Sequence, residues 1–75
     1  MENKTVINGM NIRVTTNGDE RVIFMNDGNM PHPMKWNMSF RRWDYVNEEN
    51  MPRELIALEN EISEFIQNSD QRHAN

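Results

Sequence analysis

Few side chains of this chain could carry covalent or metal chemistry. It has no cysteine, and its two histidines, His32 and His73, lie far apart in the sequence. Its serines stand in no motif with a histidine, and its three glycines form no phosphate-binding loop. A metal site would depend mainly on carboxylates. We therefore predict no catalytic residue, no cofactor and no metal site, and we expect a protein that is not an enzyme.

The segment Met30–Val46, MPHPMKWNMSFRRWDYV, offers the chemistry of recognition instead. It holds both tryptophans, the one tyrosine and an adjacent pair of arginines. These residue types dominate the energetic centres of protein interfaces. The segment therefore predicts a contact surface formed by Arg41, Arg42, Trp43 and Tyr45.

The same segment permits a second interpretation. Proteins that bind single-stranded nucleic acid stack bases on aromatic side chains beside a basic groove, and Lys35–Tyr45 contains both kinds of residue. The formal net charge of −4 weakens this interpretation, because phosphate contacts require an excess of cations. Binding of single-stranded nucleic acid therefore stands as the alternative to a protein interface.

Acidic residues gather in the C-terminal part of the chain. Residues 1–46 carry six basic and five acidic residues, whereas residues 47–75 carry two basic and seven acidic ones, so the local charges are +1 and −5. This asymmetry predicts an acidic interaction surface, for which Glu54, Glu61 and Glu64 are the candidates. The alternative is an ordinary solvated helix face.

The elements that position these residues begin with strands. In residues 10–16, MNIRVTT, apolar and polar side chains alternate, as in a half-buried strand. The four residues Asn17–Glu20 fit a hairpin loop after it. Asn8-Gly9 predicts either an earlier turn, preceded by a short leading strand, or a one-residue bulge.

Residues 21–25, RVIFM, read as a strand that is apolar on both faces. We expect Val22 and Phe24 to face the core. Ile23 and Met25 then face either a covering loop or a partner, because a two-faced apolar strand is usually covered on both sides. Together with the thin core of so short a chain, these two residues predict a homodimer formed through the sheet.

Residues 35–40, KWNMSF, alternate again and predict a strand that buries Trp36 and Phe40. The alternation breaks at the arginine pair. A continued strand would turn Trp43 and Tyr45 outward, whereas a bulge at the arginines would turn both inward.

A helix is expected from about Pro52 to Gln67, followed by a frayed tail over residues 68–75. Proline suits the first helical turn, and the apolar residues that follow recur at helical spacing. Residues 1–75 then form one small α+β domain, in which three or four antiparallel strands within residues 4–46 precede one helix packed on the sheet. The expected core consists of Ile12, Val14, Val22, Phe24, Trp36, Phe40, Leu55, Leu58, Ile62 and Phe65.

The chain shows neither a signal-peptide pattern nor an apolar stretch that could span a bilayer, so we expect a cytoplasmic protein without membrane contact. Its small size, its asparagine and methionine content and its lack of catalytic motifs resemble accessory proteins of phages and mobile elements, without a shared motif. The expected function is a small binding protein that modulates or inhibits a larger protein.

Overall fold

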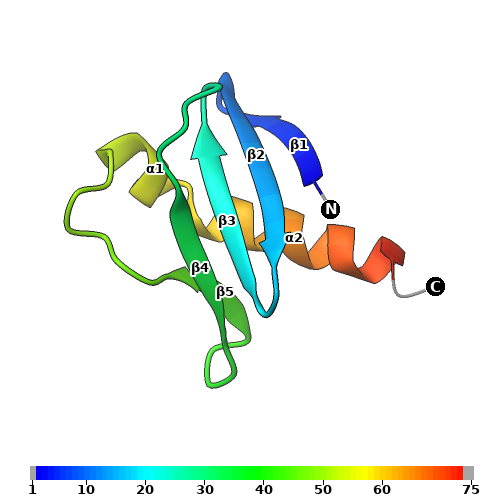
Figure 1. Ribbon diagram of the computed structural model, residues 1–75. Helices are drawn as coiled ribbons and strands as arrows, with labels where there is room; N and C mark the ends of the chain where they lie inside the picture. Colours follow the sequence, from blue (N-terminus) through cyan, green and yellow to red (C-terminus); the bar gives the residue numbers. More distant parts are fainter. Residues whose placement is uncertain (1, 74–75) are drawn as a thin grey trace.

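The computed structural model describes residues 2–73 as a sheet followed by helices (Figure 1). Five antiparallel strands neighbour one another in chain order. The predicted α+β class is confirmed, with five strands in place of the three or four expected. The elements are β1 (Glu2–Ile7), β2 (Met10–Asn17), β3 (Glu20–Met25), β4 (His32–Asn37), β5 (Arg42–Tyr45), α1 (Arg53–Ala57) and α2 (Glu59–His73).

Tight turns with left-handed backbone join the first three strands. Asn8 and Gly9 have φ values of 52° and 77°, the combination that a two-residue type I′ turn requires. Gly18, with φ of 62°, begins the second two-residue turn. The outer residues of the expected loop, Asn17 and Glu20, instead pair across the two strands. Both asparagine–glycine pairs therefore mark hairpins.

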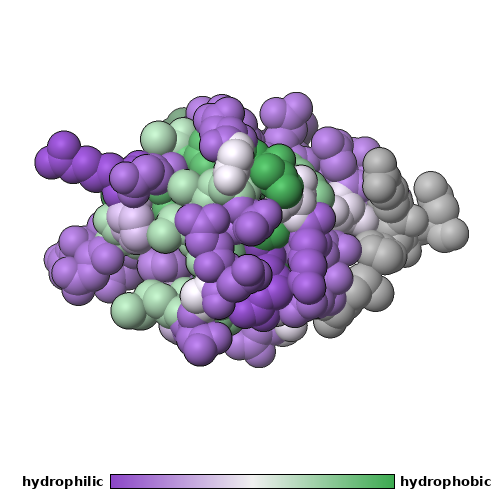
Figure 2. Space-filling model, turned by 90° about the horizontal axis from the view of Figure 1, so that it is seen from above, coloured by the Kyte–Doolittle hydropathy of each residue, from purple (hydrophilic) through white to green (hydrophobic). Residues whose placement is uncertain are grey.

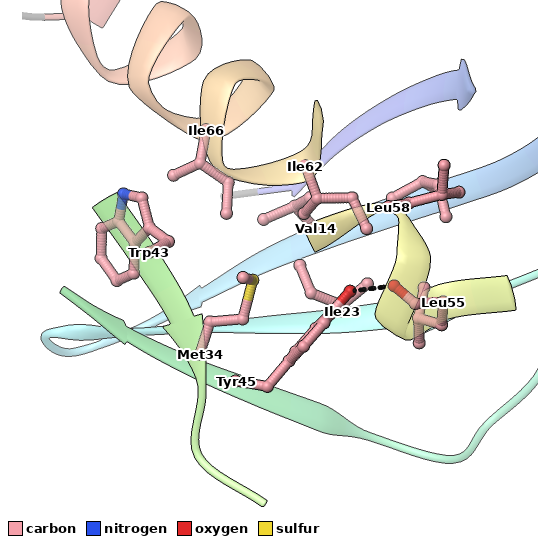
Figure 3. Packing of buried hydrophobic residues seen from close by; sticks show 10 residues of the cluster. Val14, Ile23, Met34, Trp43, Tyr45, Leu55, Leu58, Ile62 and Ile66 are labelled. Carbon is pink, nitrogen blue, oxygen red and sulfur yellow. Dashed lines mark hydrogen bonds between the residues drawn. The ribbon is translucent and has the colours of Figure 1, made fainter. Parts of the chain in front are cut away.

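The helices cover one face of the sheet, and the core lies between the two layers (Figures 1 and 3). Seen from above, hydrophilic side chains dominate the surface, and hydrophobic ones gather near the middle of the view (Figure 2). Leu58, Ile62 and Ile66 recur every four residues, so one side of the helical segment is apolar. The buried apolar residues are Ile12, Val14, Ile23, Met34, Trp43, Tyr45, Leu55, Leu58, Ile62 and Ile66.

Strand β3 faces the core with the opposite set of residues from the one expected. Ile23 is fully buried and Met25 packs against the core, whereas Val22 and Phe24 lie half-buried. The prediction that Val22 and Phe24 belong to the core is wrong. Because β3 is apolar on both faces, its own sequence does not define its orientation. Pairing with β2 decides it, by setting Ile23 opposite the buried Val14.

No helix in the described part of the chain, residues 2–73, covers the other face of the sheet (Figure 1). Phe24 lies on this open face beside Arg13, whose guanidinium carbon is 4.1 Å from the centre of the phenyl ring. Arg13 also donates to the Glu2 carboxylate at 3.2 Å. The aliphatic and planar parts of the arginine thus shield an aromatic ring that no second layer covers.

A turn divides the segment that was expected to form one strand over residues 35–40. Strand β4 ends at Asn37, residues 38–41 form the turn, and β5 begins at Arg42. Phe40 is therefore 69% exposed, and the prediction that it belongs to the core is wrong. Residues of a turn do not belong to the sheet, so the alternation of apolar residues at positions 36, 38 and 40 does not direct Phe40 into the core.

The turn also settles the orientation of the aromatic residues that follow. Trp43 and Tyr45 point into the core, which is the orientation expected for a bulge at the arginine pair, but the turn over residues 38–41 and not a bulge produces it. Trp36 lies opposite Trp43 in the register but remains 40% exposed, so its assignment to the core is wrong as well. It has the predicted orientation but lies near the end of the sheet.

The helical region is longer than expected and is interrupted. Leu58, with φ of −98° and ψ of 10°, separates α1 from α2. Helix α2 continues past the expected end at Gln67 as far as His73, and residues 74–75 lie outside the described residues. Arg21 of β3 donates to both carboxylate oxygens of Asp70 at 3.2 Å. This ion pair connects the C-terminal part of α2 to strand β3.

Candidate interaction surface

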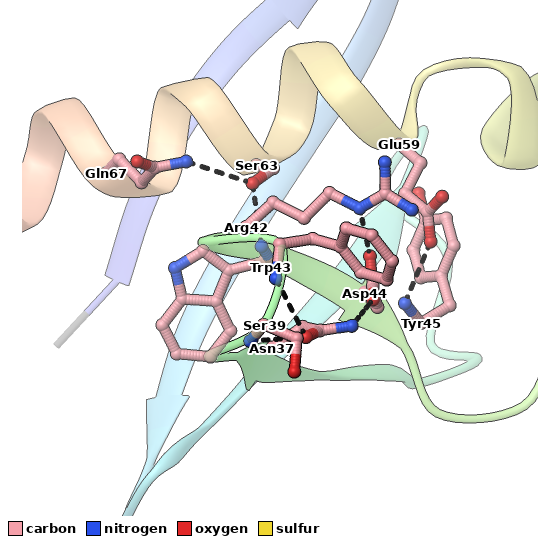
Figure 4. Close-up of polar contacts among 10 residues, drawn as sticks. Asn37, Ser39, Arg42, Trp43, Asp44, Tyr45, Glu59, Ser63 and Gln67 are labelled. Atoms are coloured by element: carbon pink, nitrogen blue, oxygen red, sulfur yellow. Dashed lines mark hydrogen bonds and ion pairs between the residues drawn. The ribbon is translucent and has the colours of Figure 1, made fainter.

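The β4–β5 hairpin extends from the body of the sheet (Figure 1), and Asn37 orders its turn. The Asn37 Oδ1 atom accepts hydrogen bonds from the backbone N–H groups of Ser39, at 3.0 Å, and Phe40, at 3.2 Å. Its Nδ2 atom donates to the Asp44 carboxylate at 2.7 Å (Figure 4). Arg41 ends the turn with a left-handed φ of 54°. The turn is therefore a defined structure and not a loose loop.

Large apolar side chains are exposed around this turn. Met38 is 82% exposed, Phe40 is 69% exposed and Trp36 is 40% exposed. Single exposed apolar residues are normal on a protein surface. Met38 and Phe40 both belong to the turn, whereas Trp36 packs beside Trp43 on the face of the hairpin opposite to Arg42. Neighbouring exposed apolar side chains such as Met38 and Phe40 are typical of interaction sites.

Two arginines flank these apolar side chains. The Arg42 guanidinium carbon lies 5.3 Å from the centre of the Phe40 ring, and its Nε atom donates to Asp44 Oδ1 at 2.8 Å. Arg41 is exposed at the end of the turn. Aromatic and arginine side chains are thus held together at one end of the molecule. We call this surface the hairpin tip and define it as Met38, Phe40, Arg41 and Arg42.

The two aromatic residues predicted to share this surface are buried instead. Trp43 is 6% exposed and Tyr45 is 8% exposed. The Trp43 ring meets the edge of Trp36 at a centroid distance of 5.7 Å and lies under the Arg21 guanidinium at 4.8 Å. The Tyr45 hydroxyl donates to the carbonyl of Leu55 at 2.8 Å (Figure 3). These residues hold the hairpin in place, whereas Arg41 and Arg42 are exposed, with Arg42 paired to Asp44.

Ile23 and Met25, the predicted sheet interface, face the molecule's own helices. Ile23 has no exposed surface, and Met25 is packed against the core. Burial of Ile23 and Met25 within the chain removes them as the reason to expect a homodimer. The homodimer stays a prediction, and sedimentation equilibrium would test it.

The three predicted acidic residues are all exposed but do not line one site. Glu61 and Glu64 of α2 line a groove beside β1. Glu54 belongs to α1 and is not part of that groove. The structure therefore brings two of the three candidates together.

Two titratable groups in the core have shifted pKa values. Burial, together with the negative charges of Glu59 and Glu48, raises the pKa of Tyr45. Burial lowers the pKa of His32, which is 8% exposed. Neither group belongs to the hairpin tip. Among residues 2–73, no group of three or more histidine or carboxylate side chains is placed to hold a metal ion.

Sequence reasoning missed Met38 as an exposed residue and took Phe40 for a core residue. A signal was present, because asparagine and serine at positions 37 and 39 are typical of turns. The regular alternation of Trp36, Met38 and Phe40 masked that signal.

No protein-family model matches this chain, and no curated protein and no solved structure matches it. No helix within residues 2–73 combines the length and the hydrophobicity needed to cross a membrane.

Proposed function

We propose that this chain is a small non-enzymatic binding protein, cytoplasmic in location, that modulates or inhibits a larger protein by contacting it through the hairpin tip. The observation that carries the proposal is the exposure of Met38 and Phe40, at 82% and 69%, on an ordered turn. Complete burial of such a side chain stabilises a complex by roughly 1.5–3 kcal/mol. Burial of Met38 and Phe40 by a partner would therefore contribute substantially to the stability of a complex.

The order of the turn supports the same proposal. Binding costs free energy when loops and side chains lose their freedom. The Asn37 side chain fixes the turn, and the contacts of Arg42 with Phe40 and Asp44 hold the arginine in place. A partner would therefore meet a surface that is already arranged, with aromatic and arginine side chains typical of binding hot spots.

The alternative function, binding of single-stranded nucleic acid, would use residues of the same β4–β5 hairpin. Trp36 and Phe40 could stack on bases while Arg41 contacts a phosphate group. Two observations favour a protein partner. Arg42 is already paired with Asp44, and the formal net charge of the chain is −4.

Affinity capture with matched variants tests the proposal. The immobilised chain is exposed to a lysate of the organism that encodes it, in parallel with the double variant Met38→Ser/Phe40→Ser. The control is Met30→Ser/Val46→Ser, which removes two exposed apolar side chains outside the tip. We expect one protein to be retained by the natural chain and by the control but lost with the tip variant. With that protein purified, the tip variant should bind at least about tenfold more weakly.

Retention that does not differ between the tip variant and the control would contradict the proposal. A labelled single-stranded oligonucleotide separates the alternative function. Binding that weakens steeply with salt and is lost in Arg41→Ala/Arg42→Ala would establish nucleic-acid binding instead.

A further inference from the structure

The two edge strands of the sheet, β1 and β5, differ in whether their outward backbone groups are hydrogen-bonded. At the β5 edge, the backbone N–H of Trp43 donates to Ser63 Oγ at 2.8 Å, and that of Tyr45 donates to Glu59 Oε2 at 3.0 Å (Figure 4). Side chains of α2 thus occupy backbone N–H groups that a further strand would need. At the β1 edge, no hydrogen bond from residues 2–71 occupies the outward backbone groups.

The register of β1 shows which backbone groups point outward. The two-residue turn at Asn8-Gly9 closes on the pair Ile7 and Met10, and such a turn closes on a hydrogen-bonded pair. Inward-directed and outward-directed residues then alternate along the strand. The N–H and C=O groups of Glu2, Lys4 and Val6 therefore face away from the sheet.

Beside this edge lies an open groove of about 460 Å³ between β1 and α2. Ile7 and Phe65 give it an apolar lining, and both also pack against the core. Glu61 and Glu64 line it from the helix and are exposed. The groove thus combines an unpaired strand edge, an apolar floor and two negative charges on one side.

We propose that the β1 edge and this groove bind an extended basic segment of a partner protein, which adds to the sheet as a sixth strand. The proposal does not depend on the hairpin tip. Backbone hydrogen bonds to Glu2, Lys4 and Val6 supply affinity for any extended chain. Every second side chain of the added strand faces α2. Lysine or arginine at these alternate positions meets Glu61 and Glu64, which selects a basic segment.

A second copy of this chain fits the edge less well. Antiparallel pairing of two β1 strands about a two-fold axis keeps both α2 helices on the same face of the joined sheet. Glu61 and Glu64 of both copies would then lie on that face beside the axis. Like charges on one face of the joined sheet are unfavourable, so the charge of the groove favours a basic partner over self-association.

The test uses a defined probe, a seven-residue peptide in which lysine alternates with valine, and its counterpart with glutamate in place of lysine. Amide chemical shifts of the isotopically labelled protein are followed by NMR. We expect the lysine peptide to shift the amides of Glu2, Lys4 and Val6, and the glutamate peptide to leave them unchanged. Glu61→Gln/Glu64→Gln should weaken binding of the lysine peptide roughly tenfold.

Two further variants keep the result specific. Glu49→Gln/Glu54→Gln removes two exposed charges outside the groove and should bind as the natural protein does. Val6→Pro removes an outward N–H that β2 does not use, so the strand should persist while peptide binding is lost. Circular dichroism checks that the fold is retained.

Equal binding by the groove variant and its charge control would overturn the proposal. It would also be overturned if the peptide shifted amides away from β1, or if the protein formed a dimer that Val6→Pro dissociates. Variants of the hairpin tip should leave peptide binding unchanged, so this proposal and the proposed function fail separately.

Discussion

Tyr45, the one tyrosine of the chain, makes the clearest prediction at the scale of single residues. Its hydroxyl donates to the Leu55 carbonyl at 2.8 Å, and burial raises its pKa. The folded state therefore favours the neutral phenol. This contribution to stability is complete below the ordinary tyrosine pKa of about 10 and is lost as the pH rises through the higher folded value. We expect the free energy of unfolding to fall above about pH 10.

The variant Tyr45→Phe isolates this contribution. It should lose about 1 kcal/mol of stability at neutral pH, because the buried Leu55 carbonyl loses the hydrogen bond from the Tyr45 hydroxyl and keeps the one from the Leu58 N–H. Its loss of stability above about pH 10 should be smaller than that of the natural chain. Urea unfolding at several pH values measures both effects. Tyrosinate absorbance that rises near pH 10 without unfolding would contradict the assignment.

At the scale of elements, the β4–β5 turn contains a strained position. Arg41 has a φ of 54°, a conformation that disfavours residues with a Cβ atom. Arg41→Gly should stabilise the protein by about 0.5–1 kcal/mol, because relief of this strain exceeds the entropy cost of glycine. The same variant should weaken partner binding at the hairpin tip, so stability and binding change in opposite directions.

Thermal unfolding of two glycine variants measures this effect. The matched control is Arg42→Gly, which lies in strand β5 and pairs with Asp44. Glycine inside a strand is unfavourable, so this control should be less stable than the natural chain. Equal destabilisation by both variants would show that the left-handed φ of Arg41 carries no strain.

At the scale of the whole molecule, the sheet and the helices depend on one shared core. Ile62 of α2 is fully buried between the layers, and isoleucine-to-alanine changes in cores cost about 2–5 kcal/mol. A chain of this length has roughly that much stability in total. We expect Ile62→Ala to be largely unfolded at room temperature, with strand and helix signals lost together.

Urea unfolding followed by circular dichroism and by tryptophan fluorescence measures this cooperativity. Ile56→Ala, at a half-buried position of α1, should cost less and serves as the control. A folded sheet that survives the loss of helix signal in Ile62→Ala would show that the two layers are independent.

The sequence alone determined the parts of this protein that depend on local preference. Alternation in β2 placed Ile12 and Val14 in the core. The two asparagine–glycine pairs indicated turns, with a bulge left open at Asn8-Gly9 and a four-residue loop expected over Asn17–Glu20, and both pairs form two-residue turns. Helical spacing identified Leu55, Leu58 and Ile62 as core residues. In each case a single short stretch contains the whole signal, because one pattern fits only one conformation.

Tertiary structure decided the strand orientations and side-chain burials that depend on contacts between two or more elements. Strand β3 could turn either face inward, and only its register against β2 buries Ile23 instead of Phe24. The segment with both tryptophans was ambiguous by one residue, and the turn at residues 38–41 made Trp43 core and Phe40 surface. The hairpin tip and the β1 groove each depend on such pairings. A one-residue change of register exchanges the two faces of a strand, so residue types alone could not place these surfaces.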